Sequence, residues 1–134
     1  KRNVDPNRLI FTDALSFEQH IARHTLGDLG LDTFNYNGHT MTSDALSAGL
    51  PVLTKAGASF SSRVSASLLS SLGVPELITY SEREYEEKAI NIARNPELLI
   101  RLKDKIESLK NKSSLFNSKL YTKNLESIFM RLVK

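Results

Sequence analysis

Residues 31–44 read LDTFNYNGHTMTSD, a stretch that leaves an apolar run, passes through a turn of Asn and Gly, and enters a segment with helical spacing. Gly38 stands just before the expected helix, where a glycine lets the backbone come close to a ligand. The unpaired amides of a first helical turn, together with the positive end of the helix dipole, favour phosphate groups. The stretch therefore predicts a strand, a phosphate-binding turn and a helix, in that order.

The side chains that follow Gly38 suit the same kind of ligand. The hydroxyls of Thr40 and Thr42 add donors, and His39 can hydrogen-bond a phosphoryl oxygen or offset its charge. Asp44 lies one helical turn after Thr40 on the same face, where a carboxylate accepts hydrogen bonds from the two hydroxyls of a ribose. The alternative is a plain helix start with a surface histidine, because Asn-Gly turns before helices are common.

Four short apolar runs punctuate the first two-thirds of the chain, at residues 9–11, 29–31, 52–53 and 77–78, with segments of helical length between them. Strands that alternate with helices through short loops are typical of a parallel sheet with crossover helices. From Ser81 onward we expect only helices, the first of them opened by a capping box of Ser81 and Glu84. We predict one domain over residues 1–134, with the parallel α/β part in 1–80 and a helical tail in 81–134.

Open parallel sheets bind ligands at the carboxyl ends of their strands. In this chain those ends are the loops around residues 12–17, 32–42, 54–62 and 79–82. Arg63 follows the third loop; it could contact phosphate or sugar, but we favour a salt bridge that opens a helix.

A second group of polar residues lies on the first expected helix. His20 and Arg23 are three residues apart and project from one side of it, with His24 beside them. An imidazole stacks on a nucleobase, and a guanidinium donates to a base carbonyl or stacks on the ring. The alternative is a partly buried structural histidine next to Phe17 and Ile21.

The composition narrows the classes of function. With no cysteine, the chain has neither a disulfide framework nor thiolate chemistry. With three histidines, all within residues 20–39, and no Asp-x-Asp pair, we expect no metal and no cofactor. The net charge of +3 reflects an excess of lysines in residues 101–123. Acidic residues alternate with them and no aromatics interleave, so we expect a solvated face and no nucleic-acid partner.

Targeting signals are not visible in the sequence. No apolar run approaches the roughly 18 residues of a membrane span, and no signal-peptide pattern opens the chain. We therefore expect no membrane partner and a cytoplasmic location. Because the chain starts at Lys1, close to the apolar run at residues 9–11, we interpret it as a fragment of a longer protein.

The motif Asn37-Gly38-His39-Thr40 stands between Leu-Asp-Thr at residues 31–33 and Asp-Ala-Leu at residues 44–46. In this order the residues resemble the catalytic region of the O-linked N-acetylglucosamine transferase family. Further matches cover nearly the whole chain; they lie at residues 8–11, 48–52, 62–67, 76–78, 84–85, 115–117 and 121–122.

The resemblance implies a fold and an activity. That family has the two-lobed GT-B architecture, so we expect an α/β class with a Rossmann-like parallel sheet and flanking helices, here a partial C-terminal lobe with a helical tail. The resemblance also implies transfer of N-acetylglucosamine from UDP-N-acetylglucosamine to Ser or Thr hydroxyls of proteins, with inversion at the anomeric centre and without a metal.

For the nucleoside, His20 and Arg23 match family positions that contact uracil, and Asp44 matches a ribose contact. Relatives that use GDP-fucose have Glu in place of Asp44 and lack the histidine of Asn-Gly-His-Thr, so we expect a UDP-sugar donor. One departure is Phe17, which stands where the family often has a lysine.

For the diphosphate, Gly38, His39, Thr40 and the amide of Met41 match the positions that hold it, with His39 stabilising the leaving group. Met41 replaces a usual threonine, so one hydroxyl is lost while the amide remains. Residues 55–57 read Lys-Ala-Gly where Pro-Gly is common. These departures would weaken binding or suit another sugar.

The resemblance also implies partners. They are UDP-N-acetylglucosamine or a similar nucleotide sugar, a protein acceptor, the N-terminal lobe, and tetratricopeptide repeats of the parent chain. The catalytic base would lie outside this fragment, which we expect to be inactive alone. The alternative is a non-catalytic nucleotide-binding or protein-interaction module on the same fold.

Overall fold

The computed structural model describes residues 4–133 and contains a sheet of three parallel strands in the order β1-β2-β3. The strands are β1 (Gly30–Leu31), β2 (Val52–Lys55) and β3 (Ile78–Thr79). Gly30 pairs with Val52, and Thr54 pairs with Ile78. Three of the four expected strands and the predicted parallel sheet with flanking helices are therefore confirmed.

The expected strand at residues 9–11 is wrong. This segment is irregular and follows the short 3-10 helix η1 (Pro6–Arg8), and its side chains are exposed, with Phe11 at 90%. An apolar run becomes a strand only where a neighbouring strand takes its backbone hydrogen bonds. Among residues 4–133 no strand pairs with this segment.

Six α-helices and two further 3-10 helices complete the described part of the chain. They are α1 (Phe17–His24), α2 (Thr40–Ser47), α3 (Val64–Leu72), η2 (Pro75–Leu77), α4 (Glu82–Arg94), α5 (Pro96–Lys110), η3 (Ser114–Phe116) and α6 (Ser118–Leu132).

Local sequence sets where these helices begin and end. A capping box of Ser16 and Gln19 opens α1, and Gly73 closes α3 in the left-handed conformation at φ 96°. The capping box predicted at the start of α4 is confirmed only in part. The Ser81 hydroxyl accepts from the Glu84 amide at 3.2 Å, but the Glu84 carboxylate accepts from the amide of Tyr80 at 2.8 Å instead of that of Ser81.

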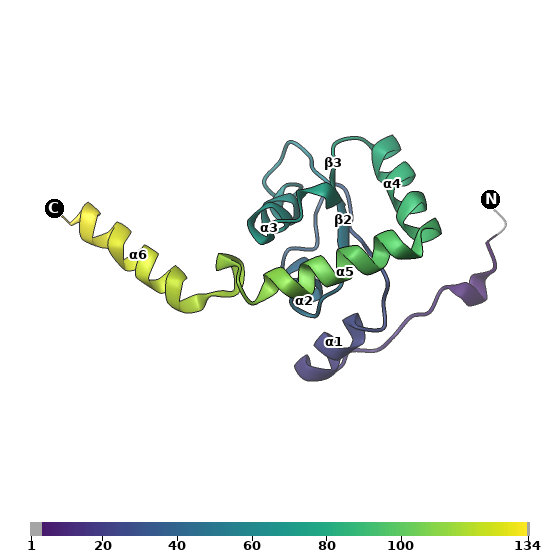
Figure 1. Ribbon diagram of the computed structural model, residues 1–134, viewed down its shortest axis with the longest axis horizontal. Helices are drawn as coiled ribbons and strands as arrows, with labels where there is room; N and C mark the ends of the chain where they lie inside the picture. The colour runs from purple at the N-terminus through teal and green to yellow at the C-terminus, as the bar shows by residue number, and fades with distance from the viewer. Residues whose placement is uncertain (1–3, 134) are drawn as a thin grey trace.

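The core lies where α2, α3 and α4 contact β2 and where α5 packs against α2, α3 and α4. Its fully buried side chains include Leu46, Leu53, Leu69, Leu77 and Ile106. In Figure 1, α5 crosses the body beside the sheet, and α6 extends away from it toward the C-terminus. Among the described residues no helix is long and apolar enough to cross a membrane. The domain boundaries expected from the sequence stay a prediction.

Candidate nucleotide-binding site

The loop between β1 and α2 is held in place by Asp32, the first residue after β1. Its Oδ1 accepts a hydrogen bond from the Gly38 amide at 2.8 Å, and its Oδ2 accepts from the Thr54 hydroxyl at 2.7 Å. Asn37, only 1% exposed, donates to the Thr33 carbonyl at 2.8 Å. The entrance to α2 is therefore fixed to the sheet before any ligand binds.

Gly38 and His39 form the turn itself. A Cβ on Gly38 would lie 2.8 Å from Thr42 Oγ1, so only glycine fits without a shift. His39 is the N-cap residue of α2 with φ 34° and ψ −104°, the one positive-φ residue other than glycine in the described part of the chain. Such a backbone costs energy and is held only where the surroundings dictate it, most often at functional sites.

The amides at this helix start divide into used and unused donors. The Gly38 amide donates to Asp32, and the Met41 amide donates to the Gly38 carbonyl at 2.6 Å. The amides of His39 and Thr40 have no acceptor among residues 4–133. The structure thus points to these two as the open donors, whereas the Met41 amide, expected to hold diphosphate, already has a partner.

The His39 ring is fixed on three sides. Its Nε2 lies 3.1 Å from the Ser61 carbonyl oxygen, and because a carbonyl only accepts, Nε2 carries the hydrogen. The ring stacks on Tyr36 at 4.6 Å between centroids and meets the edge of Phe60 at 6.0 Å. Nδ1 is therefore the nitrogen that can face a ligand, and it donates to a phosphoryl oxygen only when the ring is an imidazolium.

Thr42 does not belong to the site, and the expectation of a ligand donor there was wrong. Its side chain is 3% exposed, and its hydroxyl bonds to that of Ser65 at 2.8 Å. Thr40 is exposed at the helix start. The two threonines are two residues apart and so point to different sides of α2.

The residues expected to bind the nucleoside meet where α1 packs against α2. His20 Nε2 lies 3.5 Å from Asp44 Oδ2, and Arg23 Nη2 lies 3.1 Å from His20 Nδ1. Arg23 also donates to the hydroxyl of Thr12 and to the carbonyl of Asp13. Spacing along the chain gave no sign that His20 and Asp44 would touch.

Sequence reasoning also missed side chains at the carboxyl ends of β1 and β2. Lys55 lies 3.3 Å from Glu82 and 4.6 Å from the centre of the Phe34 ring. The Tyr85 hydroxyl donates to the Asp32 carbonyl at 3.1 Å. Burial, with a smaller contribution from the charge of Asp32, raises the pKa of Tyr85 to about 12. The signal that could have found them is their position, since Asp32 directly follows the apolar run at 29–31 and Lys55 comes two residues after the run at 52–53.

Arg63 lies at the N-cap of α3 with its side chain exposed. The salt bridge expected to open that helix is absent, since Arg63 forms no ion pair with any residue that the structure describes. It lines a small cavity of about 280 Å³ together with Phe60 and Val64.

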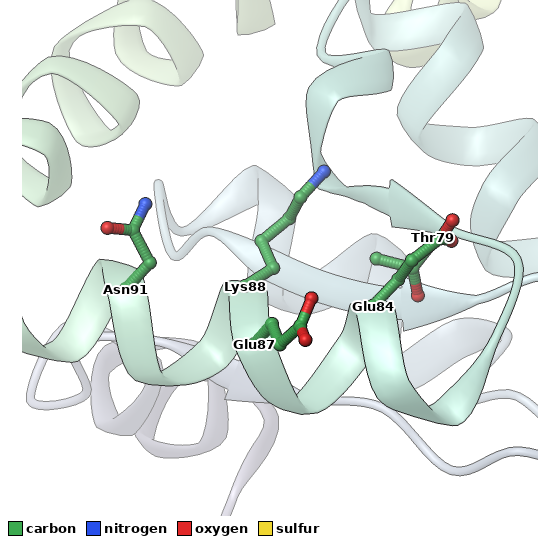
Figure 2. Close-up of a pocket in the computed structure, with 5 residues that line it drawn as sticks. All are labelled: Thr79, Glu84, Glu87, Lys88 and Asn91. Carbon is green, nitrogen blue, oxygen red and sulfur yellow. The ribbon is translucent and has the colours of Figure 1, made fainter.

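A larger cavity of about 450 Å³ lies along α4 (Figure 2), and none of the residues expected to bind a nucleotide lines it. Thr79, Glu84, Glu87, Lys88 and Asn91 line it. Its one lysine donates to the Glu76 carbonyl at 2.7 Å, and Glu87 pairs with Arg83 at 2.8 Å. With an acidic lining and its cation already engaged, this cavity does not suit a diphosphate.

Metal ligands do not gather in the described residues, where no group of three or more His, Cys, Asp or Glu side chains is arranged around a common point. Metal independence of the reaction and the lack of a cofactor stay predictions.

Comparison with known proteins gives consistent results. The family described as Glycosyl transferase family 41 matches residues 1–125. The UDP-N-acetylglucosamine–peptide N-acetylglucosaminyltransferase of Caenorhabditis elegans is 34% identical over 134 residues, 100% of this chain and 12% of that protein. SEC of Arabidopsis thaliana, described as a probable UDP-N-acetylglucosamine–peptide N-acetylglucosaminyltransferase, is 36% identical over 132 residues. The match covers 98% of this chain and 14% of that protein.

A solved structure matches as well. A mutant of the Thermobaculum terrenum O-GlcNAc transferase superposes with a TM-score of 0.89 at 30% identity, over 97% of this chain and 25% of that one. The match confirms the expected fold class. The chain spans only a small part of the relatives that it matches.

Proposed function

The chain belongs to glycosyl transferase family 41, and from that premise we propose that it supplies the UDP-binding part of an enzyme that glycosylates proteins. The donor is UDP-N-acetylglucosamine, and the acceptors are Ser or Thr hydroxyls. The relatives in Caenorhabditis elegans and Arabidopsis thaliana, which are described as UDP-N-acetylglucosamine–peptide N-acetylglucosaminyltransferases, the second as a probable one, support this substrate class.

The observation that carries the proposal is the open start of α2. The amides of His39 and Thr40 lack acceptors among the described residues, and they lie at the positive end of the helix dipole. A diphosphate placed there meets two donors that the fold has already aligned. Asp32 keeps the loop from rearranging to satisfy those donors internally.

His39 would act on the leaving group. As the sugar–phosphate bond breaks, negative charge grows on the diphosphate, and an imidazolium Nδ1–H directed at it stabilises the transition state more than the ground state. A donor of this kind contributes about 3 kcal/mol when it is well placed. The contact between Nε2 and the Ser61 carbonyl supports this role, because it fixes the ring and leaves Nδ1 as the nitrogen available to a ligand.

The nucleoside would lie across the contact between α1 and α2. Both nitrogens of His20 already face Arg23 and Asp44, so its ring meets uracil by stacking. Asp44 Oδ2 faces His20, and its Oδ1 has no partner among residues 4–133 and can accept from a ribose hydroxyl. The three side chains together form the nucleoside part of the site.

The reaction we propose is direct displacement by the acceptor hydroxyl at the anomeric carbon, with inversion and without a metal. The helix start and His39 would offset the diphosphate charge that a metal offsets in other transferases. The catalytic base, the second lobe and tetratricopeptide repeats that present acceptors are proposed for the parts of the protein beyond this chain.

Calorimetric titration with UDP tests the proposal on the protein at its natural length. His39→Ala and Asp44→Asn should each weaken binding at least about tenfold, the effect of losing one charged contact. Lys88→Gln, in the cavity of Figure 2, is the matched control and should leave the affinity unchanged. Loss of UDP binding in the Lys88 variant alone would place the nucleotide elsewhere and reject the proposal. A protein that binds UDP but turns over no sugar donor would instead be a nucleotide-binding module.

A further inference from the structure

His24, the last residue of α1, contacts the nucleoside part of the site without belonging to it. Its Nε2 lies 3.3 Å from Nε2 of His20, and the two rings meet edge to face with centroids 4.7 Å apart. The charged and titratable groups that surround it are His20 and Arg23 on α1 and Asp44 on α2. His24 is therefore placed to influence His20 directly.

The partners of His20 determine where its proton lies. A guanidinium only donates, so Nδ1 of His20, 3.1 Å from Arg23 Nη2, is an acceptor and the hydrogen is on Nε2. That Nε2–H faces Asp44 Oδ2 at 3.5 Å and His24 Nε2 at 3.3 Å. A neutral His24 with a lone pair on Nε2 accepts this hydrogen and completes the arrangement.

Protonation of His24 would break the arrangement. Its Nε2–H would then point at the Nε2–H of His20, so that two donors oppose each other and one ring has to turn. Burial, followed by the charges of His20 and Arg23 and opposed by Asp44, lowers the pKa of His24 below its ordinary value of 6.5. The neutral ring is thus the form present at neutral pH.

We propose that His24 is a positioning residue that, while neutral, accepts the Nε2 hydrogen of His20 and so fixes the His20 ring between Arg23 and Asp44, which makes binding of the nucleobase sensitive to acid. This inference rests on the proposed function, because it assumes that the base stacks on His20. Protonation of His24 releases His20, and the affinity for the nucleotide sugar falls.

Calorimetry with UDP-N-acetylglucosamine between pH 5.5 and 8 tests the inference on the protein at its natural length. Each phosphate of this donor carries one ester bond and shares the anhydride bond, so neither has a proton that titrates in that range. His24→Gln keeps a hydrogen-bonding group that does not titrate, so affinity at pH 8 should stay within about twofold of the wild type while its loss on acidification shrinks. His24→Ala should bind about fivefold more weakly at pH 8.

The ring nitrogens of His20 give a second readout that needs no ligand. In selectively ¹⁵N-labelled protein, the wild type should show His20 as the Nε2–H form. His24→Ala should keep that form, because Arg23 still donates to Nδ1, but should shift the Nε2–H resonance, because the acceptor of that hydrogen is gone. An unchanged His20 spectrum in that variant, or an unchanged acid response in His24→Gln, overturns the inference and leaves the proposed function standing. A wild type that binds no UDP-N-acetylglucosamine at any pH overturns both.

Discussion

Asp32 ties Gly38, which with His39 forms the turn into α2, to the sheet. One carboxylate oxygen accepts from the Gly38 amide at 2.8 Å, and the other accepts from the hydroxyl of Thr54 on β2 at 2.7 Å. The helix start that we assign to the diphosphate therefore depends on a side chain that need not touch the ligand.

Removal of this carboxylate should cost both stability and binding. Asp32→Ala leaves the Gly38 amide without its partner and the fully buried Thr54 hydroxyl unpaired, so the free energy of unfolding should drop by about 2–4 kcal/mol. Urea denaturation measures the loss. Asp32→Asn, which keeps one acceptor oxygen, is the matched control and should lose less. Equal losses of stability in the two variants would contradict the role given to the oxygen that Asn retains.

Gly38→Ala should strain the turn. The new Cβ would lie 2.8 Å from Thr42 Oγ1, so the loop must shift, at a cost of about 1–3 kcal/mol. Thermal unfolding of the single variants and of the double variant Gly38→Ala/Thr42→Ala separates this contact from other effects. Because the double variant removes the clash, its loss should be smaller than the sum of the single losses. If the loss in the double variant equalled the sum of the two single losses, the contact between the new Cβ and Thr42 would not be the cause of the destabilisation.

His39→Ala should slow the reaction more than it weakens binding. Charge grows on the diphosphate in the transition state, so kcat should fall roughly a hundred- to a thousandfold while KM changes less. Steady-state kinetics with UDP-N-acetylglucosamine and a peptide acceptor measure both constants. Asn91→Ala, on the cavity along α4, should leave both unchanged. A variant with normal kcat and a raised KM would assign His39 to ground-state binding only.

Tyr85 should make the protein less stable in alkali. Its pKa is raised to about 12 in the folded protein, above the ordinary value of 10.0. The unfolded chain therefore loses the phenolic proton first, so the stabilisation is complete below pH 10 and is lost as pH rises from 10 toward 12. Denaturation at pH 9 and pH 11 should show a smaller drop in stability for Tyr85→Phe than for the wild type. Identical drops in stability for Tyr85→Phe and the wild type would show that Tyr85 does not cause the loss of stability in alkali.

The sequence predicted the sheet well, because short apolar runs flanked by turns become strands where neighbours cover them. Gly30, Val52 and Ile78 all pair with neighbouring strands, as expected. The run at residues 9–11 has the same pattern, but no strand among residues 4–133 pairs with it, and pattern alone cannot show whether a partner is present. The prediction of a capping box at α4 was wrong in part, because the Glu84 carboxylate accepts from the amide of Tyr80, one residue earlier than the motif predicts.

The candidate site was predicted only as far as local spacing reaches. The turn at Gly38 and His39 could be placed, because a strand, a turn and a helix follow one another within a few residues. The pairing of His20 with Asp44 depends on how α1 packs against α2, which spacing does not encode. The inward direction of Thr42 likewise depends on Ser65, which lies on a different helix.

The central claim is that the start of α2 binds the diphosphate, and a crystal structure of the natural-length protein with UDP tests it most directly. We predict diphosphate oxygens within hydrogen-bonding distance of the amides of His39 and Thr40, with a ribose hydroxyl at Asp44. A diphosphate bound elsewhere, with those two amides still unpaired, would contradict the claim.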